Sequence, residues 1–492
     1  VVGSWGPKMD GSIKDMALGK LPYSARDNDL YQDFLRTGST WTNSVELTKS
    51  SEEITFRAGL TRLDNSAVVP NSGLDRTSIN LRTTAKMAKW LDADIKINYI
   101  NQNTKNRISI ARDPNNVFMD NLYRPRSIAF SDYDAYKDNN WKRADGKPAA
   151  YVFDHNAAPD NVYWSAYRNQ NSDKRDRYIG MAALNFTFTD WLSLKLRAGM
   201  DNYTFQYDMT RATGNPYWEQ GGSYRVQTER FKEVNTDFLL TFKKDWKSLG
   251  IFATFGGNIM KQSSSMNNDF SGELEIPDFY SISAGKEHYA EYDKSRKQVN
   301  SLYGTLSLSY NSQVYLDVPG RNDWSSTLPK DNYSYFYPSA SLSWIFSETL
   351  NRAGVNIGPL SFGKIRGSWA KVGNDTDPYR LTNTYNLKYN IKDGTMGVTR
   401  DDWRANPNLK NETVRSYEAG LELRAWNDRI GLDVSWYKTN AFDQILKVAI
   451  PPATGYKYDL INAGNIQNTG WEIVLNATPI KSLKFSWDTN IN

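Results

Sequence analysis

The chain has 492 residues, with 60 basic and 55 acidic side chains that give a net charge of +5, and it contains no cysteine. Because opposite charges are mixed along the chain, we expect no nucleic-acid-binding stripe. The lack of cysteine excludes disulfides, thiolate metal sites and a cysteine nucleophile. No run of about eighteen apolar residues occurs, so the sequence offers no candidate for a membrane-spanning helix.

Two parts of unequal size are expected. Residues 1–39 should form an extracellular segment that leads into a large β domain, residues 40–492. The first strand of that domain is expected from Thr40 to Lys49 and should run down to a short turn. Because this strand needs a neighbour and the chain stops at Asn492 within a strand-like run, we expect further strands of the full protein on both sides of this sequence.

The strongest local pattern lies between Tyr178 and Ala198, where two segments of alternating apolar and polar residues flank the turn at Asp190 and Trp191. This alternation predicts a β-hairpin with one apolar and one polar face. Apolar residues such as Phe186, Leu194, Leu421, Leu432 and Val434 are expected on one face, and Asn185, Thr187, Ser193, Lys195 and Arg197 on the other. Similar units recur at residues 238–255, 302–318, 419–436 and 471–491.

The lengths of these segments favour a membrane barrel over a soluble β-sandwich. They run about nine to twelve residues, which suits a tilted strand that crosses a bilayer. Short links alternate with long polar links, as in outer-membrane barrels whose long loops face outward. The short links are expected near residues 49–50, 89–90, 190–191, 245–246, 311–312, 353–358, 426–428 and 481–482, and the long ones at residues 107–174, 210–232, 262–297 and 374–413.

Tryptophan positions support the same interpretation. Trp90, Trp191, Trp246 and Trp426 lie in or beside short links, where an interfacial aromatic belt would form. The alternative is that these rings are ordinary core residues at strand ends. A mean hydropathy of −0.66 is compatible with a barrel, because only every second strand residue meets lipid. The sequence therefore predicts an all-β protein, a transmembrane antiparallel β-barrel with roughly sixteen strands in this chain.

Several stretches resemble the SusC/RagA family of TonB-dependent outer-membrane transporters, and their order covers almost the whole chain. They are SWGPKMDG at residues 4–11, RNDWSSTLP at 321–329, YPS at 337–339, VGND at 372–375, NPNLKNE at 406–412, SYEAG at 416–420 and INAGNIQNTGWE at 461–472. The resemblance implies a 22-stranded barrel in the outer membrane of a Gram-negative, Bacteroidetes-type bacterium. It also implies an N-terminal plug and a TonB-contacting box, neither of which this sequence contains.

The resemblance further implies active import of large nutrients, with oligosaccharides favoured as cargo. A SusD-like surface lipoprotein lid, the TonB complex, and outer-membrane lipid and lipopolysaccharide are the implied partners, and two transporter–lid pairs can form a dimer. A peptide importer of the same family is the first alternative. The second is a barrel that serves as one component of a larger envelope assembly.

No catalytic, metal or cofactor motif is recognised. His155 and His288 lie in expected loops without the spacing of a zinc site. Asp132, Asp134 and Asp138, or Asp375 and Asp377, could donate oxygens to calcium, but they lack a full calcium-loop pattern. We therefore expect a protein that is not an enzyme and carries no cofactor.

Aromatic residues in the expected loops are the candidate substrate-binding set, because rings beside amides and charges can stack on sugars or contact a peptide. The alternative is that these rings pack the loops together. Lumen-facing polar residues are expected to contact the plug. The candidate residues are Trp141, Tyr163, Trp164, Trp218, Trp324 and Trp403.

Overall fold

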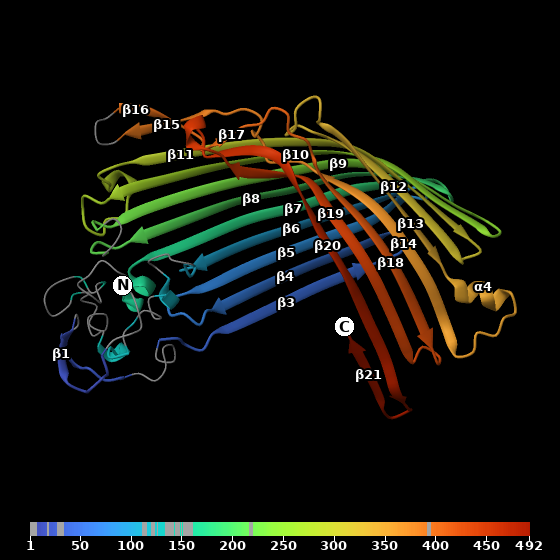
Figure 1. Cartoon of the computed structure of the whole chain (residues 1–492), viewed down its shortest axis with the longest axis horizontal. Helices are drawn as coiled ribbons and strands as arrows, with labels where there is room; N and C mark the ends of the chain where they lie inside the picture. The colour runs from blue at the N-terminus through green and yellow to red at the C-terminus, as the bar shows by residue number, and fades with distance from the viewer. Residues whose placement is uncertain are drawn as a thin grey trace.

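The computed structural model describes residues 7–16, 19–26, 34–110, 116–119, 124, 126–132, 142, 148, 150, 161–215, 220–390 and 395–492. Antiparallel strands arranged around a closed barrel dominate this part of the chain (Figure 1). Among these residues no helix is long and apolar enough to cross a membrane.

The barrel wall contains sixteen long strands and one two-residue strand, β17, which confirms the expected number. The first eight long strands are β3 Ser39–Ser50, β4 Ile54–Ser66, β5 Gly73–Ala88, β6 Leu91–Lys105, β7 Gln170–Thr189, β8 Leu192–Arg211, β9 Ser223–Trp246 and β10 Leu249–Glu273. The others are β11 Tyr289–Tyr310, β12 Val314–Ser325, β13 Ser334–Trp344, β14 Leu360–Asn374, β17 Trp403–Arg404, β18 Glu412–Ala425, β19 Ile430–Ala449, β20 Tyr458–Lys481 and β21 Ser486–Ile491.

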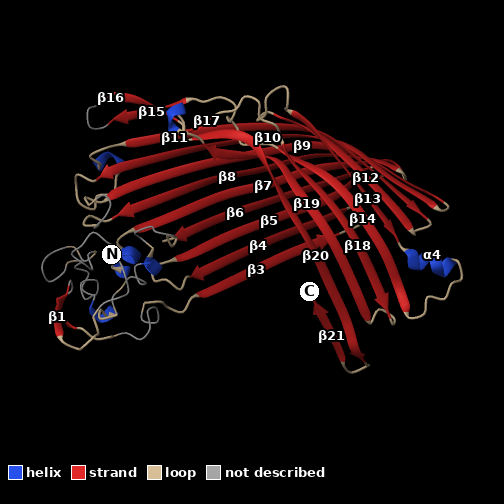
Figure 2. Cartoon of the chain, in the orientation of Figure 1, coloured by secondary structure: helices blue, strands red, loops and turns tan. Residues whose placement is uncertain are grey.

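Smaller elements lie outside the wall and are coloured by type in Figure 2. Two separate hairpins are formed by β1 Ile13–Met16 with β2 Gly19–Pro22, and by β15 Tyr385–Asn390 with β16 Thr395–Arg400. Helical elements among the described residues include η1 Phe130–Asp132, α3 Val162–Tyr167, η2 Ile282–Ala284, α4 Phe346–Arg352 and η3 Pro452–Thr454. The β15–β16 hairpin and the N-terminal segment lie at one end of the barrel, and α4 lies at the other (Figure 1).

Along the wall each long strand pairs antiparallel with the next long strand, including β14 with β18, which is the pattern expected of an up-and-down barrel, whereas the short β17 pairs in parallel with β20. For example, Leu184 of β7 faces Ala93 of β6 on one side and Leu196 of β8 on the other. Paired residues are defined in this way from β3 through β14 and from β18 through β21. The two ends of the sheet come together at β21 and β3, and β3 is exposed along its whole length.

Short turns gather at one end of the barrel, as expected. The links at residues 89–90, 190–191, 311–313, 426–429 and 482–485 agree with the prediction within three residues. Left-handed backbone at Asn311, Ser312, Trp426, Asn427 and Asp428 closes two of these turns tightly. The link expected at residues 353–358 begins earlier, at Ile345, and contains α4.

The strands on the side away from the short turns are longer than expected, so the two loops predicted at residues 210–232 and 262–297 are shorter than predicted and span residues 212–222 and 274–288. Residues 223–232 belong to β9, and residues 262–273 and 289–297 belong to β10 and β11. β9 and β10 have 24 and 25 residues, about twice the expected length. Beyond the lipid, both faces of the sheet meet polar surroundings. The strands therefore stay paired through their backbones, but their side chains no longer alternate between apolar and polar, which is the pattern from which a strand is predicted.

The register assigns every strand residue to one of two faces. Phe186 pairs with Leu194, and Leu421 pairs with Val434, so these residues share one apolar face as predicted. Large apolar side chains on this face are solvent-exposed along several strands, including Leu60, Leu184 and Ile365. In a membrane barrel the apolar face is the outer one. Below, outward means on this apolar face and inward means on the polar face.

Phe186 lies near the turn-side edge of the lipid band and not at its middle. Phe186 lies only three residues before the end of β7, and its ring stacks on Trp90 with centroids 6.1 Å apart. It therefore belongs to the aromatic belt on the turn side. Leu184, two residues further from the turn, is closer to the middle of the lipid band.

Candidate functional site: the interior and outer mouth of the barrel

Arginine–carboxylate pairs connect neighbouring strands on the inward face. Arg177 of β7 donates to Asp201 of β8 over 2.8 Å, and Arg197 of β8 donates to Asp237 of β9 over 2.9 Å. The Asp237 side chain is 4% exposed, whereas Arg197 is 47% exposed. Each pair neutralises a charge that would otherwise face the lumen alone.

A second inward network lies across β12 and β13. The guanidinium of Arg321 donates to Asp323 over 2.8 Å and to Ser301 over 2.8 Å, and the Tyr337 hydroxyl donates to Asp323. The sequence analysis placed Asp323 in a family-like motif, and the structure gives it this positioning role. Such shared carboxylates stiffen the wall without leaving a free acidic site.

Asp375 forms a salt bridge and does not form a binding site for a metal cation. Asp375 follows β14, and its carboxylate accepts hydrogen bonds from Lys297 over 2.6 Å and from the hydroxyl of Ser325 over 2.5 Å. Its side chain is 9% exposed. Because an ammonium already occupies the carboxylate, calcium ligation by Asp375 and Asp377 is not supported. Asp377 instead accepts from Arg380 over 3.0 Å.

Other candidate metal ligands are also engaged or lie outside the described residues. Asp132 accepts two hydrogen bonds from Arg26, at 2.7 and 2.6 Å. Asp134, Asp138 and His155 lie outside the part of the chain that the structure describes. Within that part, no group of three or more His, Asp or Glu side chains could hold a metal ion.

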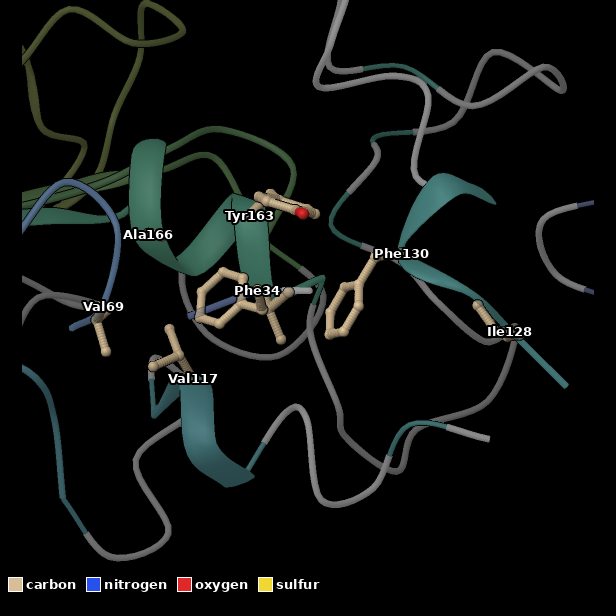
Figure 3. Packing of buried hydrophobic residues seen from close by; sticks show 8 residues of the cluster. Phe34, Val69, Val117, Ile128, Phe130, Tyr163 and Ala166 are labelled. Carbon is tan, nitrogen blue, oxygen red and sulfur yellow. The ribbon is translucent and has the colours of Figure 1, made fainter. Parts of the chain in front are cut away.

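Tyr163 is part of a loop core at the outer end of the barrel, shown in Figure 3. Its ring packs edge-on against Phe34, with centroids 5.4 Å apart, and against Phe130 at 6.1 Å. The residue is 8% exposed. The first loop core, as we call it, consists of Phe34, Val69, Val117, Ile128, Phe130, Val162, Tyr163 and Ala166.

Trp164 follows Tyr163 in α3 and is more deeply buried. Its side chain is 2% exposed, and Arg168 lies over its ring at 5.5 Å. Asn161 caps the start of this helix by accepting from the backbone N–H of Tyr163 over 3.0 Å. In this structure both α3 rings pack the loops, which is the alternative raised from the sequence.

Trp403 belongs to a second loop core, formed by Leu328, Tyr335, Trp403, Leu409 and Leu460. It is 9% exposed, with Arg380 and Lys447 over its ring at 5.1 and 5.3 Å. The amide of Asn383 donates to the Trp403 carbonyl over 2.8 Å. The two α3 rings and Trp403 thus lie in different packed units.

Of the other three candidates, the structure describes Trp324, which does not face the interior of the barrel. Trp324 pairs with Asn300 of β11, which places it on the outward face together with Ile259. Trp141 and Trp218 lie outside the described residues. The assignment of substrate contact to this set stays a prediction, and the placement of Trp324 gives it no support.

An aromatic group that was not expected from the sequence lies on the inward face. Tyr203 of β8 pairs with Phe231 of β9, and their rings stack with centroids 5.1 Å apart. Arg175 of β7 lies over Tyr203 at 5.3 Å and over Phe205 at 5.2 Å. We call Arg175, Tyr203, Phe205 and Phe231 the interior platform. Its signal in the sequence is the alternation of Tyr203, Phe205 and Tyr207 along β8.

Asp278 connects three outer segments. Its carboxylate accepts from the backbone N–H of Thr213 over 2.8 Å and from the Arg168 guanidinium over 2.5 Å. Burial of Asp278 opposes ionisation, but the Thr213 hydrogen bond and the Arg168 charge outweigh it, so the pKa of Asp278 is lowered. Burial together with this carboxylate raises the pKa of Tyr280. The charged carboxylate therefore joins the loops after β8 and β10 to α3.

Comparison with known proteins places these features in a family. The model named "TonB dependent receptor-like, beta-barrel" matches residues 112–492. TonB-dependent receptor P26 of Formosa agariphila is 24% identical over 96% of this chain and 46% of its own length. TonB-dependent receptor SusC of Bacteroides thetaiotaomicron is 30% identical over 40% of this chain and 20% of its own length.

Solved structures give the same fold. The RagAB peptide transporter superposes with a TM-score of 0.79 at 19% identity, over 94% of this chain and 51% of that one. The siderophore receptor PirA from Pseudomonas aeruginosa gives 0.51 at 13% identity, over 96% of this chain and 63% of that one. The chain thus spans about half the length, or less, of receptor P26, SusC and the RagAB chain.

Proposed function

This chain belongs to the TonB-dependent receptor-like β-barrel family of the outer membrane and is of the SusC/RagA type, and we propose that the full-length protein imports large nutrients, with oligosaccharides as the favoured cargo. The observation that carries the cargo proposal is the interior platform. Aromatic rings flanked by a guanidinium offer stacking surfaces and hydrogen-bond donors to a pyranose ring.

The electrostatics of the inward face support a cargo without strong charge. Arg177 of β7, Arg197 of β8 and Arg321 of β12 are paired with carboxylates at hydrogen-bonding distance. A charged cargo would have to compete with these pairs, whereas hydroxyl-rich cargo can exchange hydrogen bonds with them at little cost. The interior platform could accept sugars of different kinds, because stacking does not depend on a particular pattern of hydroxyl groups.

The proposed import also involves the partners that the resemblance to the SusC/RagA family implies. Energy would come from the TonB complex, and a SusD-like lipoprotein would cover the long-loop end of the barrel, with two transporter–lid pairs forming a dimer.

Peptide is the second candidate cargo, favoured by the fold similarity to the RagAB peptide transporter. An extended peptide could place an apolar side chain on Tyr203 or Phe205 and direct its backbone carbonyls to Arg175. A peptide differs from a glycan in presenting regularly spaced amide donors and acceptors. Growth of the bacterium on glycans or on peptides as nutrients distinguishes the two cargoes.

The test uses the full-length gene in its native strain. A deletion strain, complemented with the wild type or with the double variant Tyr203→Ala, Phe205→Ala, is grown on single glycans and on peptides. Growth on at least one glycan should be lost in the deletion strain and strongly reduced in the double variant at equal surface expression. Tyr178→Ala is the matched control, because Tyr178 lies on the outward face of β7.

The outcomes are distinct. Unchanged growth of the deletion strain on every glycan, with loss on peptides, would replace glycan by peptide as cargo. Unchanged growth on both would remove the import proposal. If the deletion loses growth but the double variant does not, import stands and the interior platform is not its binding surface.

A further inference from the structure

The outward face of β9, β10 and β11 carries a group of basic side chains just beyond the apolar band. Lys232 and Arg296 flank Ser263 in one row across the three strands, and Arg230 and Lys294 flank Ser265 in the next. Lys261 lies in the adjoining row, closer to the lipid. All five are exposed. We call Arg230, Lys232, Lys261, Lys294 and Arg296 the outward basic cluster.

The outward basic cluster is not balanced by carboxylates on its own face. The other outward residues in these three rows of β9–β11 are Val234, Ser263, Ser265 and Gln298. Among the described residues, no ion pair involves any of the five basic side chains. Across the barrel, Arg62 lies in the same outward row as Arg230, but it pairs with Asp64 at 2.7 Å and Asp75 at 3.2 Å.

An apolar groove lies directly on the lipid side of this cluster. Its volume is about 830 Å³. Small residues, including Ala182, Ala198 and Gly257, form its floor, and Phe238 and Leu302 form its walls. A Cβ added at Gly257 would come within 2.7 Å of the Phe238 ring and 3.1 Å of Leu302, which shows how closely the walls approach.

Strand geometry sets the height of the groove and the cluster. With a rise of about 3.3 Å per residue and a tilt of about 40°, each residue advances about 2.5 Å across the membrane. Ile259 of the groove is about ten residues from the start of β10, or about 25 Å, the usual height of the apolar band. Lys232 is about 14 residues from the turn end of β9, or about 35 Å. The cluster therefore lies at the level of outer-leaflet headgroups.

We propose that the outward groove and the outward basic cluster together bind one phosphorylated glycolipid of the outer leaflet, with an acyl chain in the groove and its phosphate on Lys232, Lys261 and Arg296. Apolar burial accounts for the chain, and basic side chains at the headgroup level attract anionic lipid. Trp324 lines the same groove, where an interfacial ring can contact both the chain and the sugar. The site is independent of the cargo pathway because it lies on the opposite face of the sheet.

The test measures lipid retained by the full-length protein. The protein is purified from outer membranes in mild detergent, washed, and analysed for bound lipid A by mass spectrometry. Its affinity is then measured with nanodiscs that contain lipid A or phosphatidylglycerol. The triple variant Lys232→Gln, Lys261→Gln, Arg296→Gln should bind lipid A about 100-fold more weakly, at about fivefold per charge. Lys89→Gln, Lys247→Gln, Lys484→Gln is the matched control, with equal charge loss at the turn end.

A second variant tests the groove without changing charge. Ala198→Phe should fill the floor and reduce lipid A retention, whereas Val45→Phe, on the outward face of β3, should not. Both variants keep an apolar residue toward lipid, so insertion of the barrel is retained. Equal binding of lipid A by the wild type and the cluster triple variant would overturn the proposal. Equal preference for phosphatidylglycerol would reject the glycolipid in favour of a general attraction to anionic headgroups.

Discussion

The turn-side half and the outer half of the barrel wall are built from the same strands but are stabilised differently. In the turn-side half, apolar residues such as Leu184 and Leu196 face outward next to each other, and the solvent for that face is lipid. In the outer half, ion pairs and loop cores surround the strands. The difference shows that alternation of apolar and polar side chains marks the part of a strand that lies in the membrane. The full length of the strand is shown only by its backbone hydrogen bonds.

The largest expected effect tests whether packing stabilises the outer half. Trp164→Ala should cost about 3–5 kcal/mol of local stability, because the ring is 2% exposed and its removal leaves a cavity. Hydrogen exchange of α3 and the neighbouring loops in the full-length protein would report the loss. Tyr167→Ala on the same helix is the control, since Tyr167 is 37% exposed. If the exchange is unchanged and cargo uptake is lost, the ring contacts cargo and the packing account is wrong.

The next effect tests the lipid-facing half. Leu184→Arg should destabilise the folded barrel by about 2–4 kcal/mol, because it places a charge within the apolar band. Asn185→Arg, on the adjacent inward residue, should cost much less. Urea titration of the barrel reconstituted in liposomes would measure both. Equal losses would mean that the assignment of the two faces is incorrect.

A third variant tests how the cost of a charge on the apolar face depends on its depth in the membrane. Phe186→Arg should cost only about 0–1 kcal/mol, because Phe186 lies in the belt beside Trp90 near the turn. A cost as large as that of Leu184→Arg would place the lipid boundary closer to the turns than the aromatic rings indicate.

The smallest expected effect concerns the pH dependence of the loops. The lowered pKa of Asp278 means that its contribution is fully present above the ordinary carboxyl pKa of about 4 and is lost as the pH falls through the folded-state value. Proteolysis of residues 274–288 should therefore accelerate at low pH. In Asp278→Asn, cleavage should already be faster at neutral pH and should change less on acidification, apart from the protease's own pH profile. A variant that shows the same pH response as the wild type would assign the effect to another group.

The turn-side half was predicted well from the sequence, because the alternating pattern of each hairpin lies within one short stretch of the chain. The segments on either side of Asp190 and Trp191 lie next to each other in the sequence and in the sheet. The outer half could not be predicted in the same way. Residues 262–273 form strand although Ser263, Ser264 and Ser265 show no apolar period, since their ladder partners supply the structure through backbone hydrogen bonds.

The candidate site shows the same limit. Tyr163 meets Phe34, 129 residues earlier in the chain, and no local pattern connects two such loops. The sequence identified aromatic loop residues but could not distinguish a buried ring from one that faces the lumen. The interior platform was detectable in principle, because Tyr203, Phe205 and Tyr207 alternate along β8, but they lie where the apolar alternation of the lipid-facing segment has ended.

The unequal strand lengths also determine the shape of the rim. β9 and β10 extend for 24 and 25 residues, whereas β12 and β13 have 12 and 11. The second loop core packs on the outer ends of these short strands through Leu328 and Tyr335. At β12 and β13 the height of the wall comes from side-chain packing, whereas at β9 and β10 it comes from continuous hydrogen-bonded strands. Because only β11 separates the two pairs, the rim changes its construction within a short stretch, and a partner seated there would meet rigid strand ends and packed loops side by side.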